Sequence, residues 1–198
     1  GLGGGSSDAA AMLLACNELF DLCLSAEAMH ELAAQLGSDV PFFLGDQSAV
    51  IEGFGERISA ADRPTALHLT LCLPGFGCAT GEVYRLFDAY APRDSAFTAA
   101  AQRVRELAAL DRVLTDAPFN DLKRAAFEHQ PTLRQLADDL SELAERPVHL
   151  TGSGSTLFVV CDNALEAEML AEAATDRIGV PAVAVGLGSK LDARSPSV

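Results

Sequence analysis

The run of glycines and hydroxyl residues that opens the chain has the composition of a phosphate-binding loop. Glycines allow backbone N–H groups to approach an anion without side-chain collision, and the start of a following helix adds unpaired donors and a positive dipole end. The hydroxyls add hydrogen bonds, and that of Ser7 is a candidate ligand for Mg²⁺. Taken alone, the run is equally typical of a flexible terminal linker. Its residues are Gly1, Leu2, Gly3, Gly4, Gly5, Ser6 and Ser7.

This run differs from the two commonest nucleotide-binding loops. No Gly-Lys-Ser/Thr sequence follows it, as a Walker loop requires. Ser6 stands where the third glycine of a dinucleotide-binding fingerprint belongs. Any phosphate binding must therefore depend on the glycines, the hydroxyls and the helix end.

A second glycine-serine turn lies far along the chain, between two strand-like apolar runs. Its residues are Gly152, Ser153, Gly154 and Ser155. Such a turn can close on the opening loop and help it to hold phosphates. The alternative is a tight hairpin turn that binds no ligand.

Asp39 is the third candidate for chemistry. It follows Gly37 and Ser38 and precedes the apolar residues 40–43. A carboxylate among apolar neighbours is expected to be desolvated, which is costly unless the group is paired or has a role. In a kinase, such a group accepts or orients the proton of the attacking hydroxyl. The alternative is a capping residue ahead of Pro41.

Apolar periodicity and capping signals predict an α+β chain, because helices and strands mix without strict alternation. A helix should follow the opening run with Ser6 or Ser7 as its cap, and a second should begin at Ser25 and end at Gly37. We place a domain boundary between residues 73 and 74, which gives domains 1–73 and 74–198. Further helices are expected over 81–90, 97–110, 118–128, 131–144 and 163–174, and strands over 48–52, 57–60, 67–73, 148–151, 156–161 and 180–187.

Composition narrows the class of protein. The 198 residues carry a net charge of −14, which disfavours binding to nucleic acid or to an anionic membrane. The sequence contains no apolar stretch long enough to span a membrane and no secretory signal. Its five cysteines form no C-x-x-C pair, so neither a disulfide framework nor a zinc site is predicted, and a cytoplasmic protein is expected.

Three segments in this order resemble the motifs of the GHMP kinases: GLGGGSSDAA at 1–10, GSDVPFF at 37–43 and TGSGST at 151–156. The segments GFGE at 53–56, PGFGCATGEVY at 74–84 and FNDL at 119–122 are also similar to members of this family. The resemblance extends from Gly1 to about Gly188. It implies a two-domain fold, in which the remainder of a ribosomal-protein-S5-like N-terminal domain precedes a ferredoxin-like C-terminal domain.

The resemblance also implies roles for individual residues. Residues 1–7 would wrap the phosphates of ATP with Mg²⁺ near Ser7, and Asp39 would be the catalytic and substrate-binding carboxylate. Thr80 and Tyr84 would lie beside the substrate, and residues 152–155 would brace the loop and contact the substrate phosphates. The implied substrate is a small alcohol, cytidine diphosphate methylerythritol, and the implied assembly is a monomer or a weak homodimer.

The family's N-terminal part also carries a lysine beside the aspartate, together with adenine and cytidine contacts. Neither Lys123 nor Lys190 stands in a matching context, and the chain begins inside a motif. We therefore expect a further N-terminal segment. Two alternatives stay open: another kinase of the family, of homoserine or mevalonate type, or a non-catalytic nucleotide-binding fragment.

Overall fold

The computed structural model divides the chain into two compact units, which are described separately. The sheet unit comprises Gly1, Pro64–Asp94 and Asp111–Val198, and the helical unit comprises Leu2–Arg63 and Ser95–Leu110. The residues that the structure describes are 1–45, 48–61, 67–90, 95–108 and 118–187. Lys190 and the polar tail after Gly188 lie outside these ranges.

The helical unit is built around a small apolar cluster. Ala10, Ala33 and Val40 are buried at its centre. The hydroxyl of Ser25 accepts a hydrogen bond from the N–H of Ala28 at 3.2 Å, and the helix stops at Gly37, so the predicted cap and stop are confirmed. Its elements are α1 (Gly4–Leu19), α2 (Ala26–Leu36), the 3-10 turn η1 (Pro41–Leu44), β1 (Ala49–Glu52), β2 (Arg57–Ala60) and α4 (Ser95–Ala108).

A β-hairpin and a helix complete the helical unit. Strands β1 and β2 pair antiparallel, with Ala49 opposite Ala60. An ion pair of 2.7 Å between Arg105 on α4 and Glu52 on β1 joins the helix to the hairpin.

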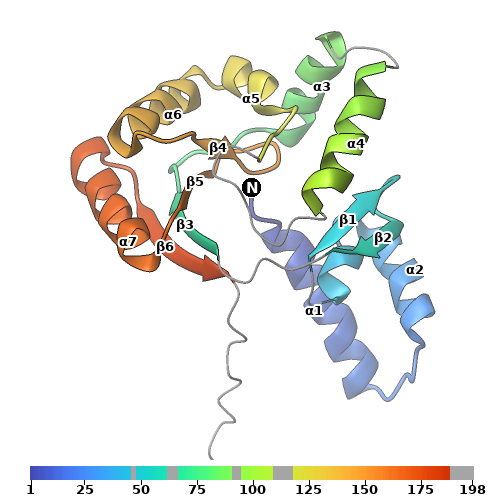
Figure 1. The fold of residues 1–198 in the computed structure, drawn as a ribbon. Helices are drawn as coiled ribbons and strands as arrows, with labels where there is room; N and C mark the ends of the chain where they lie inside the picture. The colour runs from blue at the N-terminus through green and yellow to red at the C-terminus, as the bar shows by residue number, and fades with distance from the viewer. Residues whose placement is uncertain (46–47, 62–66, 91–94, 109–117, 188–198) are drawn as a thin grey trace, which may run out of the picture. The chain divides into compact units, whose positions relative to one another are not determined.

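The sheet unit contains a four-stranded antiparallel sheet in the order β4-β5-β3-β6. Helix α7 packs on β3, β5 and β6, and α6 and α7 lie on the same side of the sheet (Figure 1). The strands are β3 (Leu67–Cys72), β4 (His149–Leu150), β5 (Leu157–Cys161) and β6 (Ala182–Leu187). The helices are α3 (Thr80–Tyr90), α5 (Lys123–His129), α6 (Pro131–Ala144), α7 (Ala164–Ala173) and the π turn η2 (Ala174–Ile178).

The core of this unit lies between the sheet and its helices. Its largest fully buried side chains include Leu133 and Leu140 of α6, Leu157 and Val159 of β5, and Val83 of α3. Helix α5 starts at Lys123, five residues later than predicted. The chain before it is held by hydrogen bonds from the side chain of Asn120 to backbone carbonyls. The mixture of helices and antiparallel strands confirms the α+β class.

The boundary between residues 73 and 74 stays a prediction. Strand β3 lies before that boundary, yet it is central in the sheet and pairs with β5 and β6, which lie after it. Residues 95–110, on the other hand, group with the helical unit.

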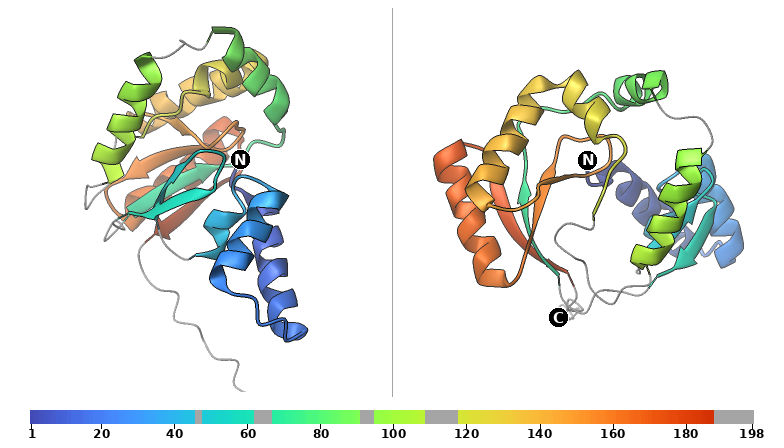
Figure 2. Two further views of the ribbon diagram at one scale, coloured as in Figure 1. Left: turned by 90° about the vertical axis from the view of Figure 1, so that its right-hand side faces the viewer. Right: turned by 45° about the horizontal axis from the view of Figure 1, so that its top comes forward.

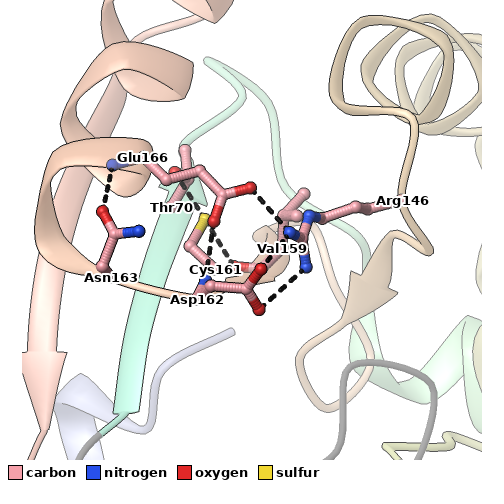
Figure 3. Close-up of polar contacts among 7 residues, drawn as sticks. All are labelled: Thr70, Arg146, Val159, Cys161, Asp162, Asn163 and Glu166. Carbon is pink, nitrogen blue, oxygen red and sulfur yellow. Dashed lines mark hydrogen bonds and ion pairs between the residues drawn. The ribbon is translucent and has the colours of Figure 1, made fainter.

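A charged cluster fixes the start of α7 (Figure 3). Asn163 caps the helix by accepting from the N–H of Glu166 at 2.9 Å, which confirms the predicted helix start. Glu166 in turn accepts from the N–H of Asp162, one residue before the cap, at 2.6 Å. Arg146 bridges Asp162 at 2.6 Å and Glu166 at 2.9 Å. The hydrogen bond from Arg146 holds the pKa of Asp162 below its usual range.

Candidate functional site

The second glycine-serine turn joins β4 to β5 in the sheet unit. Thr151 donates from its N–H to the carbonyl of Thr156 at 3.1 Å, and the N–H of Gly154 donates to the carbonyl of Thr151 at 2.8 Å. Gly152 and Gly154 have φ of +47° and +96°. These left-handed conformations favour glycine, which explains the alternation of glycine and serine.

The segment between β3 and α3 is fastened to this turn by its side chains. The hydroxyls of Thr80 and Ser153 share a hydrogen bond of 2.9 Å, and the hydroxyl of Ser155 donates to the carbonyl of Phe76. Tyr84 lies one helical turn after Thr80 and is 50% exposed. Thr80 and Tyr84 therefore share one open face of α3, because residues four apart in a helix lie above one another.

Gly1 lies against the same turn. A β-carbon on Gly1 would come within 2.6 Å of the Thr151 hydroxyl and 3.0 Å of the Gly154 carbonyl oxygen. The β4–β5 connection and the N terminus lie side by side in both views of Figure 2. Of the expected site residues, the sheet unit thus brings together Gly1, Thr80 and the turn 152–155.

The rest of the opening run belongs to the helical unit, where most of it forms the first turn of a helix. Gly3 has φ of +69° and is the residue before α1, and Gly4 to Ser7 form its first turn. The expectation that Ser6 or Ser7 caps this helix is wrong: the Ser7 hydroxyl donates to the carbonyl of Gly4 at 2.8 Å instead. The cap position falls on Gly3, because a glycine adopts the left-handed conformation without strain.

The first turn of α1 is open to an anion. A β-carbon on Gly4 or Gly5 would meet nothing within 4 Å, whereas one on Gly3 would lie 2.8 Å from the Phe43 ring. The first N–H groups of an α-helix have no partner within the helix. This geometry fits phosphate binding, and the Ser7 oxygen keeps lone pairs that suit a Mg²⁺ ligand.

Asp39 lies in the turn between α2 and η1, four residues before Phe43. Its carboxylate is exposed, and the Ser38 hydroxyl is 3.5 Å from it. The expectation of a desolvated carboxylate is therefore wrong for this unit. Val40 and Pro41, the next two residues, bury the apolar side of the turn instead.

The GFGE turn at residues 53–56 packs against the backbone of the turn that carries Asp39. A β-carbon on Gly55, whose φ is +100°, would collide with the carbonyl oxygen of Ser38. Glu56 folds back to accept from the N–H of Phe54 at 2.6 Å. The two backbones approach so closely that only glycine fits at position 55.

Asn120 is a residue of this region to which the sequence assigned no role. Its amide group donates to the carbonyls of Leu150 at 2.9 Å and Gly152 at 2.7 Å. Its oxygen accepts from the N–H of Leu122 at 2.9 Å. The FNDL segment was the available signal, but no local pattern connects it with a turn 30 residues away.

Lys123 and the buried cysteines lie in surroundings that suit a role in the fold better than a role in catalysis. Lys123 donates to the carbonyl of Val148 at 2.8 Å, and burial lowers its pKa. All five cysteines are free; two of them, Cys72 and Cys161, are buried. Burial raises the pKa of Cys72 to about 11 and raises that of Cys161, which disfavours a reactive thiolate.

Two further findings concern the described residues only. They contain no group of three or more His, Cys, Asp or Glu residues arranged to hold a metal ion. None of their helices is both long enough and apolar enough to cross a membrane.

Two family models match the chain. The model described as GHMP kinases N terminal domain matches residues 1–51, and the model described as GHMP kinases C terminal matches residues 96–178. The chain therefore belongs to the GHMP kinases.

Two relatives within this family carry the same activity name. A 4-diphosphocytidyl-2-C-methyl-D-erythritol kinase of Pseudarthrobacter chlorophenolicus is 37% identical over 87% of this chain and 56% of its own length. The enzyme of that name from Caulobacter vibrioides is 37% identical over 87% of this chain and 60% of its own length. The chain thus spans somewhat more than half the length of these relatives.

Solved structures agree with the family. A crystal structure of 4-(cytidine 5'-diphospho)-2C-methyl-D-erythritol kinase superposes with a TM-score of 0.70 at 32% identity, over 95% of this chain and 66% of that one. A homoserine kinase from Cytophaga hutchinsonii superposes with a TM-score of 0.64 at 14% identity, over 89% of this chain and 62% of that one, which shows a shared fold alone.

Proposed function

We propose that this chain is the catalytic part of an ATP-dependent kinase that phosphorylates the 2-hydroxyl of 4-diphosphocytidyl-2-C-methyl-D-erythritol, a step of the non-mevalonate route to isoprenoids. The observation that carries the proposal is the meeting of Gly1 with the turn at Thr151 and Gly154. Gly1 is the first residue of one glycine-rich segment, and within the sheet unit it lies against the second, whose backbone is likewise free of side chains that would block an anion. We infer the identity of the substrate from the names of the related enzymes.

The roles follow from the chemistry of the side chains. The first turn of α1 would hold the β- and γ-phosphates of ATP, and the Ser7 hydroxyl would be a ligand for Mg²⁺, which would supply positive charge beside them. Asp39 orients the 2-hydroxyl and accepts its proton as the oxygen bonds to the γ-phosphorus and the bond to the β-phosphate oxygen breaks. The exposure of the Asp39 carboxylate supports this role, since a substrate hydroxyl can reach it from solvent.

The substrate contacts lie on the sheet unit. Thr80, Tyr84 and the turn 152–155 bind the sugar, the base and the diphosphate of the substrate. The open face of α3 and the hydroxyl pair of Thr80 and Ser153 support this assignment.

Other parts of the proposal concern the whole protein. We place it in the cytoplasm as a monomer or weak homodimer that binds neither nucleic acid nor membranes. The net charge of −14 supports the last point, because phosphate backbones and anionic lipids repel such a chain.

A competition assay tests the substrate. Protein expressed from its complete gene is given labelled ATP, Mg²⁺ and equal amounts of 4-diphosphocytidyl-2-C-methyl-D-erythritol, homoserine and mevalonate. We expect label in the cytidine compound alone. Transfer to homoserine or mevalonate would assign a different kinase of the family, and transfer to none of the three would favour a non-catalytic nucleotide-binding protein.

A further inference from the structure

The side chain of Asn120 makes three hydrogen bonds, all of them to backbone atoms. Both donated bonds run to carbonyls that flank Thr151, at 2.9 Å to Leu150 and 2.7 Å to Gly152. The oxygen accepts from Leu122 at 2.9 Å, which fixes the orientation of the amide. An aspartate of the same shape would keep the accepting oxygen and lose both donors.

These bonds determine which way two peptide groups of the turn face. In a trans peptide, the C=O and the following N–H point in opposite directions. The Leu150 carbonyl faces Asn120, and accordingly the N–H of Thr151 points to the other side, where it donates to Thr156 at 3.1 Å. By the same geometry, holding the Gly152 carbonyl directs the N–H of Ser153 away from Asn120.

Ser153 is also the point at which the turn meets α3. Its hydroxyl shares the 2.9 Å hydrogen bond with Thr80, so one residue couples the turn to the open face of that helix. Gly152 has no β-carbon and a φ of +47°, and nothing closer than the Gly1 oxygen at 3.9 Å would meet a side chain there. The hydrogen bond from Asn120 therefore restrains this peptide group where no side chain packs against Gly152.

We propose that Asn120 is a positioning residue for the kinase reaction: it holds the Gly152–Ser153 peptide so that the N–H and hydroxyl of Ser153 face the substrate diphosphate. The proposal rests on the proposed function. Asn120 acts through the turn and contacts neither substrate nor ATP. Its loss displaces the donors, and a displacement of about 1 Å costs on the order of 100-fold in rate.

The test compares two asparagine-to-aspartate changes in protein from the complete gene. Asn120→Asp keeps the bond from Leu122 and places an oxygen against the carbonyls of Leu150 and Gly152. Asn163→Asp is the matched control, since its oxygen likewise accepts a backbone N–H at 2.9 Å and aspartate is an equally good helix cap. We expect Asn120→Asp to raise KM for the cytidine substrate about 10-fold and to lower kcat/KM about 100-fold, whereas Asn163→Asp stays within about twofold of wild type.

The split between KM and kcat separates positioning from mere loss of folded protein. A smaller folded fraction lowers apparent kcat and leaves KM unchanged, while a displaced turn raises KM for the substrate that it holds. An Asn120→Asp protein with wild-type constants, or with kcat lowered at unchanged KM, would overturn the proposal.

Hydrogen exchange distinguishes failure of this proposal from failure of the proposed function. If the wild type does not phosphorylate the cytidine substrate, the function is wrong, and exchange in the peptide covering 149–157 still reports on the turn. We expect about 10-fold faster exchange in Asn120→Asp than in Asn163→Asp or wild type, because the restraint on the turn is lost. Equal exchange in all three proteins would show that Asn120 does not position the turn.

Discussion

Gly3 and Gly4 are neighbours with opposite requirements. Gly3 needs its left-handed φ of +69° and the absence of a β-carbon, which would lie 2.8 Å from the Phe43 ring. Gly4 lies in the first turn of α1, where a β-carbon would meet no protein atom within 4 Å. The fold therefore explains Gly3 but not Gly4, for which we propose that the close approach of a phosphate is the reason.

Gly4→Ala should leave the protein folded and impair nucleotide binding. Alanine is the better helix former, so we expect unchanged stability or a gain of about 0.5 kcal/mol. The added methyl group would occupy the space of a phosphate, and we expect KM for ATP to rise about 10-fold. Thermal unfolding and ATP titration measure the two effects.

Gly3→Ala provides the comparison, because its strain and its collision with Phe43 should lower the melting temperature. If Gly4→Ala bound ATP normally, the first turn of α1 would not be the phosphate site.

Asp39→Asn should remove most of the turnover without altering the fold. The side chain is exposed, so the amide costs little stability, but it neither accepts a proton nor carries charge. We expect kcat to fall about 10²- to 10⁴-fold, the range for loss of a general base. Asp139→Asn on α6, an exposed carboxylate that accepts from Gln135 at 2.8 Å, is the control and should keep full activity. A wild-type kcat in Asp39→Asn would rule out the catalytic assignment.

At the scale of elements, Arg146 joins the end of α6 to the start of α7. Its guanidinium bridges Asp162 and Glu166, and its side chain is 24% exposed. Arg85 on α3 makes a similar contact of 2.6 Å with Glu82, but it is 68% exposed. The two pairs differ in how much water screens them, and the more buried pair should contribute more to stability.

Arg146→Met should lower the melting temperature at pH 7 by about 2 °C, and Arg85→Met should change it less. The bond from Arg146 depresses the pKa of Asp162 in the folded state. Its stabilisation is thus complete above the ordinary aspartate pKa of about 3.9 and is lost as the pH falls through the lower, folded value. The difference between Arg146→Met and wild type should therefore shrink towards pH 3. A difference that is constant with pH would show that packing, and not charge, is responsible.

The elements that the sequence predicts well are those with local signals. Ser25 and Gly37 bound α2, and Asn163 with Glu166 starts α7, because each cap depends on residues within one turn. The start of α1 was missed, since the packing of Phe43 against Gly3 is a tertiary contact. Asn120 is held by hydrogen bonds to residues about 30 positions away, and α5 begins only after it. No rule of local sequence spacing predicts such bonds.

In the candidate site, too, local sequence signals predicted some features and tertiary packing determined the others. Its residue types were recognisable from motifs, and the contact of Thr80 with Ser153 agrees with a shared site. The exposure of Asp39 was not predictable from its apolar neighbours in sequence. Val40 and Pro41 turn inward while Asp39 stays in solvent, which depends on how α2 and η1 pack.

At the scale of the whole molecule, the proposed function requires a chain of charge −14 to bind ATP and a diphosphate, both of them anions. Long-range repulsion slows their approach, and attraction is confined to helix ends and turns. Salt shortens the range of repulsion from about 30 Å at 0.01 M to about 8 Å at 0.15 M.

We therefore expect the association rate of ATP to rise about twofold between 0.01 M and 0.15 M salt, because repulsion is screened before the ligand reaches the site. Stopped-flow mixing with a fluorescent ATP analogue measures the rate. The uncharged nucleoside adenosine is the control and should show no change. A rate for ATP that falls with salt would point to a positive surface that steers the nucleotide.

The central place of β3 in its sheet has a consequence for biosynthesis. Cys72, the last residue of β3, pairs with Leu157 of β5, which leaves the ribosome 85 residues later. At roughly 5–20 residues per second, that interval lasts about 4–17 s. The other partner of β3, strand β6, is synthesised later still. Both backbone edges of β3 therefore stay unpaired while α3 to α6 are synthesised. The nascent chain thus carries a strand with both edges open while at least 85 further residues are made, and such an edge can pair wrongly with another chain unless something covers it.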